Sequence, residues 1–280
     1  MSKYLKNLYH YIQALSLDVA IGAIICCKFL AVINGIVLPI SVFISLGTAV
    51  WVIYTLDHLL DAHSIQHTAH TFRHAFHQRN KKTLGIFCLC FGFIGIANTF
   101  LYLPISLFYH GLILTSIVSL YLVIINLKVL PFATFKEFTV AIIYTAGISL
   151  PVFSLSTEAT PQLYLFTGIF FTLASINLLE FALFDFETDT KDGQLSGTRK
   201  LGYNNMKYRI NILSFLFILL MGISFYILPT ELYSALIVLL LMGSCLGLIY
   251  IKSNFFSKDD YFRIFGDFVF LFPAIYLFIS

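Results

Sequence analysis

The sequence has few charged residues. Only 11% of its 280 residues are Asp, Glu, Lys or Arg, whereas an ordinary soluble domain has roughly a quarter. Hydrophobic residues make up 59% of the chain, and a water-soluble globule could not bury that much apolar surface. The net charge of +3 is too small to indicate a nucleic-acid partner. The composition therefore excludes an ordinary soluble domain and predicts a protein embedded in a lipid bilayer.

Cysteine is also scarce and forms no pattern. The five cysteines are odd in number, fall within apolar runs and match no zinc-binding spacing. We interpret them as small apolar side chains. The first residues up to Asp18 lack a signal-peptide cleavage pattern, so the first apolar run is expected to be retained.

Long apolar runs, in contrast, fill the chain. About 20 apolar residues cross a hydrocarbon core of roughly 30 Å. Nine such runs extend from Val19 to Val37, Ile40 to Leu60, Thr83 to Leu103, Ile105 to Asn126, Phe138 to Leu155, Leu163 to Phe184, Ile210 to Leu228, Leu232 to Ile251 and Ile264 to Ser280. The sequence therefore predicts an all-α polytopic membrane protein. We expect nine transmembrane helices around a central cavity, in a single domain over residues 1–280.

The basic residues predict the orientation in the membrane, because positively charged loops stay in the cytoplasm. With the N-terminus inside, every lysine and arginine except Lys28 lies on the inner side, whereas the outer loops carry only Glu158 and Glu231. The two longest inner loops cover about residues 61–82 and 185–209. We expect a protein of the bacterial inner membrane, with its functional loops in the cytoplasm.

Two pairs of acidic residues end the second and sixth predicted spans. Asp57 and Asp61 are four residues apart, as are Asp185 and Asp189. On a helix, this spacing places both carboxylates on one face. Charged groups in membrane spans are costly and indicate function, and Mg²⁺ binds carboxylate and phosphate oxygens. Two pairs at matching helix ends therefore predict a Mg²⁺ site that binds a diphosphate.

The residues around these acids carry a family resemblance. Asp189 is followed by Lys191, Gly193, Ser196 and the run Arg199-Lys200-Leu201-Gly202. This stretch resembles the second signature of the UbiA superfamily of intramembrane prenyltransferases. Asp57 and Asp61 resemble the last two acids of the first signature, the run Thr71-Phe72-Arg73 resembles the Thr-x-Arg that follows it, and Leu17-Asp18 with Ile21-Gly22 resembles the entry to the first span. The resemblance covers essentially the whole chain.

The chain departs from the family pattern at a few positions. Val52 and Ile53 stand where the first signature opens with an Asn-Asp pair, Ser16 replaces a basic residue, and His74 replaces a proline. These departures affect one metal contact and the acceptor side of the site. Two outcomes for the donor therefore stay open, namely transfer to an acceptor or cyclisation without one.

The resemblance implies Mg²⁺-dependent transfer of an isoprenoid from a prenyl diphosphate to a lipophilic acceptor. Asp57, Asp61, Asp185 and Asp189 would hold Mg²⁺. Arg73 and Lys191 are the first candidates for contacts to the diphosphate, with Lys128 and Lys136 as second choices. Aromatic faces stabilise cations, and the candidates for that role near the inner membrane face are Tyr144, Phe181 and Tyr54.

Five histidines recur at intervals of three and four residues after the first acid pair. They are His63, His67, His70, His74 and His77. If this loop is helical, they line one helix face. Such a stripe predicts either a surface helix over the site or a transition-metal site, as in a membrane iron oxygenase. A transporter and a scaffold without catalysis are the remaining alternatives.

Overall fold

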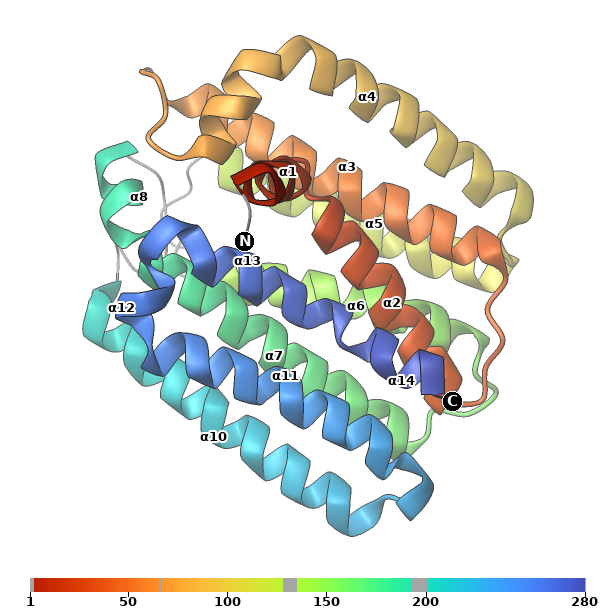
Figure 1. Cartoon of the computed structure of the whole chain (residues 1–280). Helices are drawn as coiled ribbons and strands as arrows, with labels where there is room; N and C mark the ends of the chain where they lie inside the picture. Colours follow the sequence, from red (N-terminus) through yellow and green to blue (C-terminus); the bar gives the residue numbers. More distant parts are fainter. Residues whose placement is uncertain (1–2, 66, 128–134, 193–200, 280) are drawn as a thin grey trace.

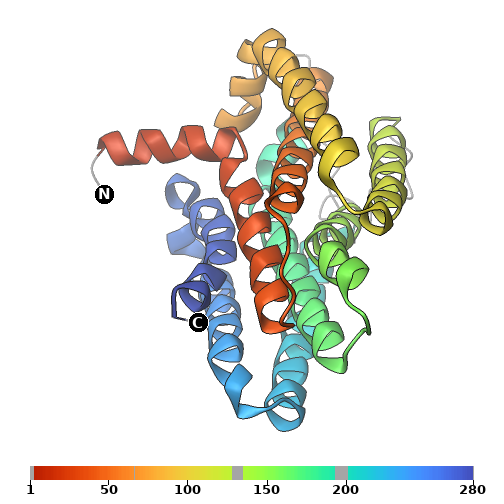
Figure 2. The ribbon, with the colours of Figure 1, turned by 90° about the vertical axis from the view of Figure 1, so that its right-hand side faces the viewer.

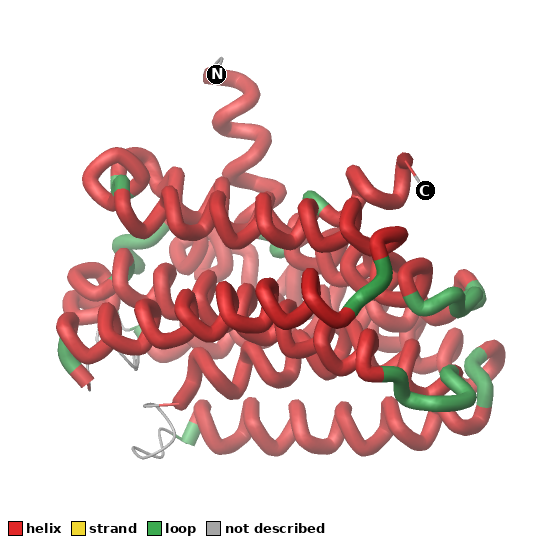
Figure 3. Tube along the Cα trace, turned by 90° about the horizontal axis from the view of Figure 1, so that it is seen from below, coloured by secondary structure: helices red, strands yellow, loops and turns green. Residues whose placement is uncertain are grey.

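The computed structural model describes residues 3–65, 67–127, 135–192 and 201–279, and these residues form helices and connecting loops without a strand (Figure 3). The helices are α1 (Lys3–Ala14), α2 (Leu17–Ile33), α3 (Ile40–Ser64), α4 (Phe72–Tyr102), α5 (Ile105–Asn126), α6 (Lys136–Leu155), α7 (Pro161–Phe184), α8 (Phe186–Asp192), α10 (Tyr203–Ile227), α11 (Tyr233–Ile251), α12 (Ser253–Phe256), α13 (Tyr261–Phe268) and α14 (Pro273–Ile279). Short 3₁₀ turns cover Thr230–Leu232, Lys258–Asp260 and Val269–Leu271.

The protein is a polytopic helical membrane protein. Eight helices of the described chain are long and apolar enough to cross a membrane, and the last of them is built from α13, α14 and the two 3₁₀ turns before and between them. The first predicted span is occupied by α2, whose 17 residues lie at the lower end of the length that spans a bilayer. The outward faces are apolar, as on α4, where Leu89, Phe93 and Phe100 are more than two thirds exposed. Apolar surfaces of that size on helices long enough to span a bilayer suit a lipid environment.

The long helices form a bundle around α7 (Figures 1 and 2). In the most apolar 18-residue stretch of α7, 72% of the residues are buried, against 6% in α5. Helix α4 packs against α3, and α5 packs against α6. The C-terminus lies at the end of the bundle opposite to α8 (Figure 1). Helix α7 is thus the core element, while α4 and α5 face the surroundings.

Helix α1 projects sideways from the bundle (Figure 2). It is joined to the rest of the protein by Tyr9, whose hydroxyl donates a hydrogen bond to the Ile264 carbonyl at 3.1 Å. Burial raises the pKa of the Tyr9 phenol above its usual range, so the group stays a neutral donor. The α1 residue Tyr11 packs against Phe72 and Phe76 of α4. These contacts hold α1 across the end of the bundle where α4 begins.

Gly266 allows α13 to approach α7 closely. A methyl group at this position would lie 2.5 Å from Asn177 Oδ1 and 2.6 Å from the Phe181 ring. Small residues let helices pack closely in membranes. Gly266→Ala is therefore expected to destabilise the protein by about 1–3 kcal/mol through overpacking.

The matched control is Gly222→Ala in α10, because a methyl group there meets no atom within 4 Å. The midpoint of thermal unfolding in detergent should fall for Gly266→Ala and stay level or rise for Gly222→Ala, since alanine favours helix over glycine. Equal midpoints for the two variants would show that α13 and α7 are not in close contact.

The prediction of a histidine stripe on one helix is wrong. Helix α3 ends at Ser64, where Ile65 turns extended, and α4 begins at Phe72 after Thr71, whose hydroxyl accepts a hydrogen bond from the His74 N–H at 3.4 Å. His67 and His70 therefore lie in the non-helical connection. The Gln78 side chain satisfies this backbone, accepting from the Ala69 N–H and donating to the carbonyls of Ala62, Ile65 and His67.

Candidate active site

A cavity of about 170 Å³ gathers charged side chains from five parts of the fold. We call it the charged cavity. Its acidic and basic lining residues are Asp57, Asp61, Arg73, Lys136, Asp185, Arg263 and Asp267. Four carboxylates and three cationic groups thus surround one small space in an apolar bundle. Such groups are expensive to bury in a membrane protein and mark functional sites.

Helix α3 presents Asp57 and Asp61 to the cavity one turn apart, on the same face. Asp61 Oδ2 lies 3.4 Å from Lys136 Nζ, which stands at the first position of α6. The charged groups that act most strongly on Asp57 are Lys136, Asp61 and Arg73. The spacing of four residues therefore places Asp57 and Asp61 on the same face of α3, as the sequence predicted, and Lys136 faces both acids.

Asp185 lies on the other side of the cavity, at the C-terminal cap of α7. Its carboxylate is paired with the guanidinium of Arg263 from α13, and both side chains are largely buried. The same guanidinium lies over the rings of Phe181 and Phe262, 5.3 Å and 5.2 Å from their centroids. Arg263 is thus held by an ion pair and by two aromatic faces.

Sequence reasoning did not assign Arg263 or Asp267 to the site. Both line the charged cavity, four residues apart on α13. That spacing is itself a signal, because it places an acid and a base on one face of an otherwise apolar span. Their partners, however, come from helices far away in the chain.

Arg73 stands between the charged cavity and a larger space. This outer basin of about 660 Å³ is lined by residues of α1, residues 70–73, the junction of α7 and α8, and residues of α10 to α13. Gln13, Arg73, Asp185 and Arg263 line both spaces. The Arg73 guanidinium forms no hydrogen bond or ion pair with the described residues, and its Nε is buried. It is therefore available to an anion that enters from the basin.

Aromatic rings form the apolar part of the cavity wall. They belong to Tyr54, Tyr144, Phe181 and Phe270. The Tyr144 ring lies 5.4 Å from that of Phe270, and its hydroxyl is 3.8 Å from Cys26 Sγ, so the ring is fixed by packing on both sides. A cation in this space would face electron-rich rings and little water.

Three of the predicted residues are not placed at the cavity. Lys191 is exposed on α8 and lines neither the charged cavity nor the outer basin. The side chain of Asp189 and all of Lys128 lie outside the described residues. The segment from Gly193 to Lys200, which carries part of the family resemblance, also lies outside them. One turn residue, Asp185, separates α7 from α8.

The histidines divide into two groups. His74 and His77 are buried beside His58 of α3, with ring centroids 6.4 Å and 5.3 Å from that of His58. His67 and His70 lie near Asp192 of α8. Within the described part of the chain, this second group is the only trio of metal-binding side chains whose ligand atoms all lie within 4.8 Å of one another.

The donor chemistry of the charged cavity fits Mg²⁺. Its carboxylates approach the space singly or in pairs, and Mg²⁺ typically takes one or two carboxylates together with water and phosphate oxygens. The cationic groups suit the phosphate oxygens themselves.

No family model matches the chain, and neither a curated protein nor a solved structure shows significant similarity to it.

Proposed function

We propose that the protein is a Mg²⁺-dependent prenyltransferase that moves an isoprenoid from an allylic diphosphate to a lipophilic acceptor within the membrane. One observation carries the proposal: carboxylates and cationic groups converge on one cavity beside an aromatic wall. Carboxylates bind hard cations, arginine binds phosphate oxygens, and aromatic rings stabilise a carbocation. A prenyl diphosphate needs all three as its C–O bond breaks.

The residues divide these tasks by position. Arg73, which has no partner in the described chain, would bind the diphosphate as it enters from the outer basin. Asp57, Asp61 and Asp185 would hold Mg²⁺, which supplies Lewis-acid stabilisation of the charge that develops on the leaving diphosphate. Asp189, Lys128 and Lys191 keep the roles that the family resemblance implies.

The aromatic wall would receive the isoprenoid. Tyr54, Tyr144 and Phe181 line the cavity close to its charged side chains, so the cation formed on ionisation would lie against their rings. The small volume also limits the water that could quench it. The bilayer outside the apolar helices would supply the lipophilic donor and acceptor.

We also propose how the protein lies in the membrane. Helix α2 would act as a ninth span, so that nine spans surround the charged cavity. The end of the bundle that carries α8 and the α3–α4 connection would face the cytoplasm of a bacterium, because the basic residues gather on that side in the sequence. A diphosphate made in the cytoplasm would then reach Arg73 directly.

A second candidate is cyclisation of the same donor without an acceptor. It is favoured by the departures of Ser16, Val52, Ile53 and His74 from the family pattern, because they affect the acceptor side of the site. Both activities release diphosphate and both need the same carboxylates, so only their products differ.

The test is an assay of purified protein in nanodiscs with radiolabelled geranyl, farnesyl or geranylgeranyl diphosphate. We expect diphosphate release that requires Mg²⁺ and stops with EDTA. A prenylated phenolic acceptor would identify transfer, and a cyclic hydrocarbon would identify cyclisation. The absence of diphosphate release with every donor, with and without acceptor, would contradict both activities and favour a transporter or a scaffold.

A further inference from the structure

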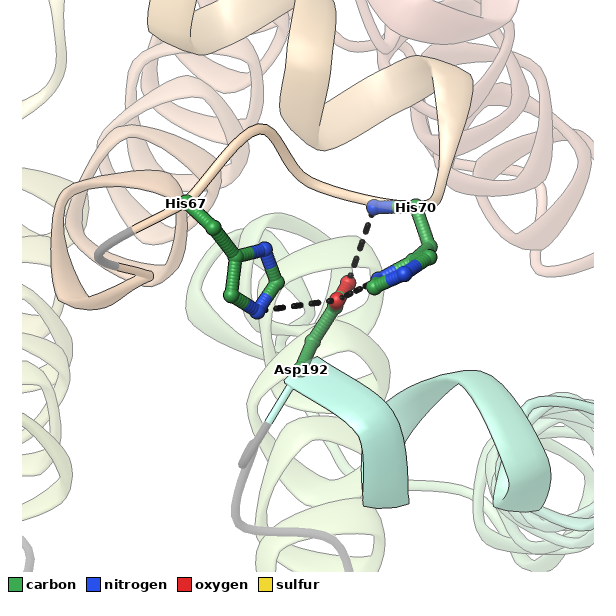
Figure 4. Close-up of side chains that lie close together, drawn as sticks. All are labelled: His67, His70 and Asp192. Carbon is green, nitrogen blue, oxygen red and sulfur yellow. Dashed lines mark hydrogen bonds and ion pairs between the residues drawn. The ribbon is translucent and has the colours of Figure 1, made fainter.

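A compact group of three metal-binding side chains lies outside the charged cavity. Two of them, His67 and His70, come from the connection between α3 and α4, and the third, Asp192, is the last residue of α8 (Figure 4). His67 Nε2 is 3.9 Å from Asp192 Oδ1, and His70 Nδ1 is in direct contact with the same oxygen. Segments more than 120 residues apart are thus brought to one carboxylate oxygen.

Hydrogen bonds to the surrounding backbone orient these groups. His67 Nδ1 lies 3.0 Å from the Thr68 carbonyl oxygen, so this nitrogen carries the proton and donates it. In the neutral ring, Nε2 is then unprotonated and directs its lone pair at Asp192. The other carboxylate oxygen, Oδ2, accepts a hydrogen bond from the His70 backbone N–H at 3.3 Å. Metal-binding histidines and carboxylates are typically fixed by such outer hydrogen bonds.

In this orientation two hydrogen-bond acceptors face each other. A lone pair of His67 faces a carboxylate oxygen, and both are hydrogen-bond acceptors, so a positively charged group between them is favourable. Asp192 is fixed, with a side chain only 2% exposed, whereas both imidazoles are half exposed and can adjust. An ion bound by nitrogen and oxygen at about 2.0–2.2 Å separates its ligand atoms by roughly 3.3 Å, so each imidazole needs only a small movement.

We propose that His67, His70 and Asp192 form a transition-metal site that binds Zn²⁺. Two imidazole nitrogens and one carboxylate oxygen form a ligand set that suits Zn²⁺ and is unsuited to Mg²⁺, which prefers oxygen alone. Three protein ligands leave the fourth tetrahedral position to water or another ligand. The site is therefore distinct in chemistry and place from the carboxylates of the charged cavity.

The bound ion would join two segments that carry other functional residues. Arg73 follows His70 by three residues, and Asp185 precedes Asp192 by seven. His70 also lines the outer basin. A metal at this position would hold the α3–α4 connection against α8 at the rim of the basin and so fix the place of Arg73.

The experiment uses the whole protein in detergent, purified with a tag free of histidine and stripped of metal with EDTA. We expect a titration with Zn²⁺ to show one saturable site per chain, and Co²⁺ to give a visible absorption band of a tetrahedral complex. His67→Ala, His70→Ala and Asp192→Asn should each weaken the binding of Zn²⁺ at least about 10-fold. Zn²⁺ should also raise the midpoint of thermal unfolding of the unchanged protein.

Two control variants separate this site from general metal binding. His63→Ala removes an exposed histidine at the end of α3, and Glu187→Gln removes an exposed carboxylate of α8, but neither belongs to the trio. Both controls should bind Zn²⁺ as the unchanged protein does. Thermal unfolding without metal would show that each variant is folded.

Three results would overturn the proposal: no saturable Zn²⁺ site, equal loss of binding in His63→Ala and His70→Ala, or loss in His77→Ala with full binding in His70→Ala, which would place the ion at the buried histidines. The outcome is independent of the diphosphate assay, since Zn²⁺ binding is measured without substrate.

Discussion

Asp57→Asn is expected to lower the rate of Mg²⁺-dependent diphosphate release by roughly 100-fold or more, as the loss of one charged group at a reacting centre typically does. The carboxylate lies one turn before Asp61 on the cavity face of α3 and has no ion-pair partner within the described residues. Asparagine keeps the shape of the side chain but lacks the negative charge that binds Mg²⁺.

The thermal stability of Asp57→Asn should not fall with its activity. A carboxylate that forms no ion pair in an apolar bundle is costly, so its neutral isostere should leave the midpoint of thermal unfolding unchanged or higher. The matched control is Glu231→Gln, which removes an exposed acid from the 3₁₀ turn before α11, at the other end of the bundle, and should leave the rate unchanged. If Asp57→Asn kept more than a third of the rate, Asp57 would have no part in the reaction.

Arg263→Met is expected to destabilise the protein by about 3–5 kcal/mol, because it leaves the carboxylate of Asp185 buried without its cation. The side chains of this ion pair are only 10% and 15% exposed, so water compensates little of the loss. The measurement is the free energy of unfolding in detergent, or the midpoint of thermal unfolding where refolding fails. Lys258→Met removes an exposed cation shortly before α13 and should have almost no effect.

A double-mutant cycle separates the ion pair from the packing of Arg263. Asp185→Asn in the Arg263→Met background should recover a large part of the lost stability, since no charge is then left unpaired. Failure to recover would mean that the contacts of Arg263 with Phe181 and Phe262 dominate its role. In either case the cycle measures how strongly α13 depends on α7.

The described structure accounts for the distribution of charge in this protein. Asp61 with Lys136 and Asp185 with Arg263 are opposite charges from different helices, so each ion pair also joins two parts of the bundle. Arg73 and Asp57 have no such partner in the described chain. The two ion pairs therefore lower the cost of holding charge in the cavity, and Arg73 and Asp57 are the groups there that a charged ligand would meet without breaking an ion pair.

Much of the fold could be predicted from the sequence, because crossing a bilayer is a local requirement. Run length and apolar composition predicted eight long apolar helices that the described structure confirms, since each span must satisfy its own backbone hydrogen bonds in lipid. The spacing of Asp57 and Asp61 predicted a shared helix face for the same local reason. The histidine spacing matches a helical repeat but misled. The cap formed by Thr71 and the hydrogen bonds of Gln78 stabilise a non-helical connection instead.

The sequence by itself determined the class of the protein and the helix ends at which its acids lie, since hydropathy and helical period act over a few turns. Only the tertiary structure decided which charges meet. Arg263 reaches Asp185 across 78 residues and His70 reaches Asp192 across 122, and both contacts result from how the helices pack. No periodic pattern in one segment specifies a partner in another. The unpaired Arg73 could be recognised only after every described neighbour was in place, because a missing partner is a property of the whole fold.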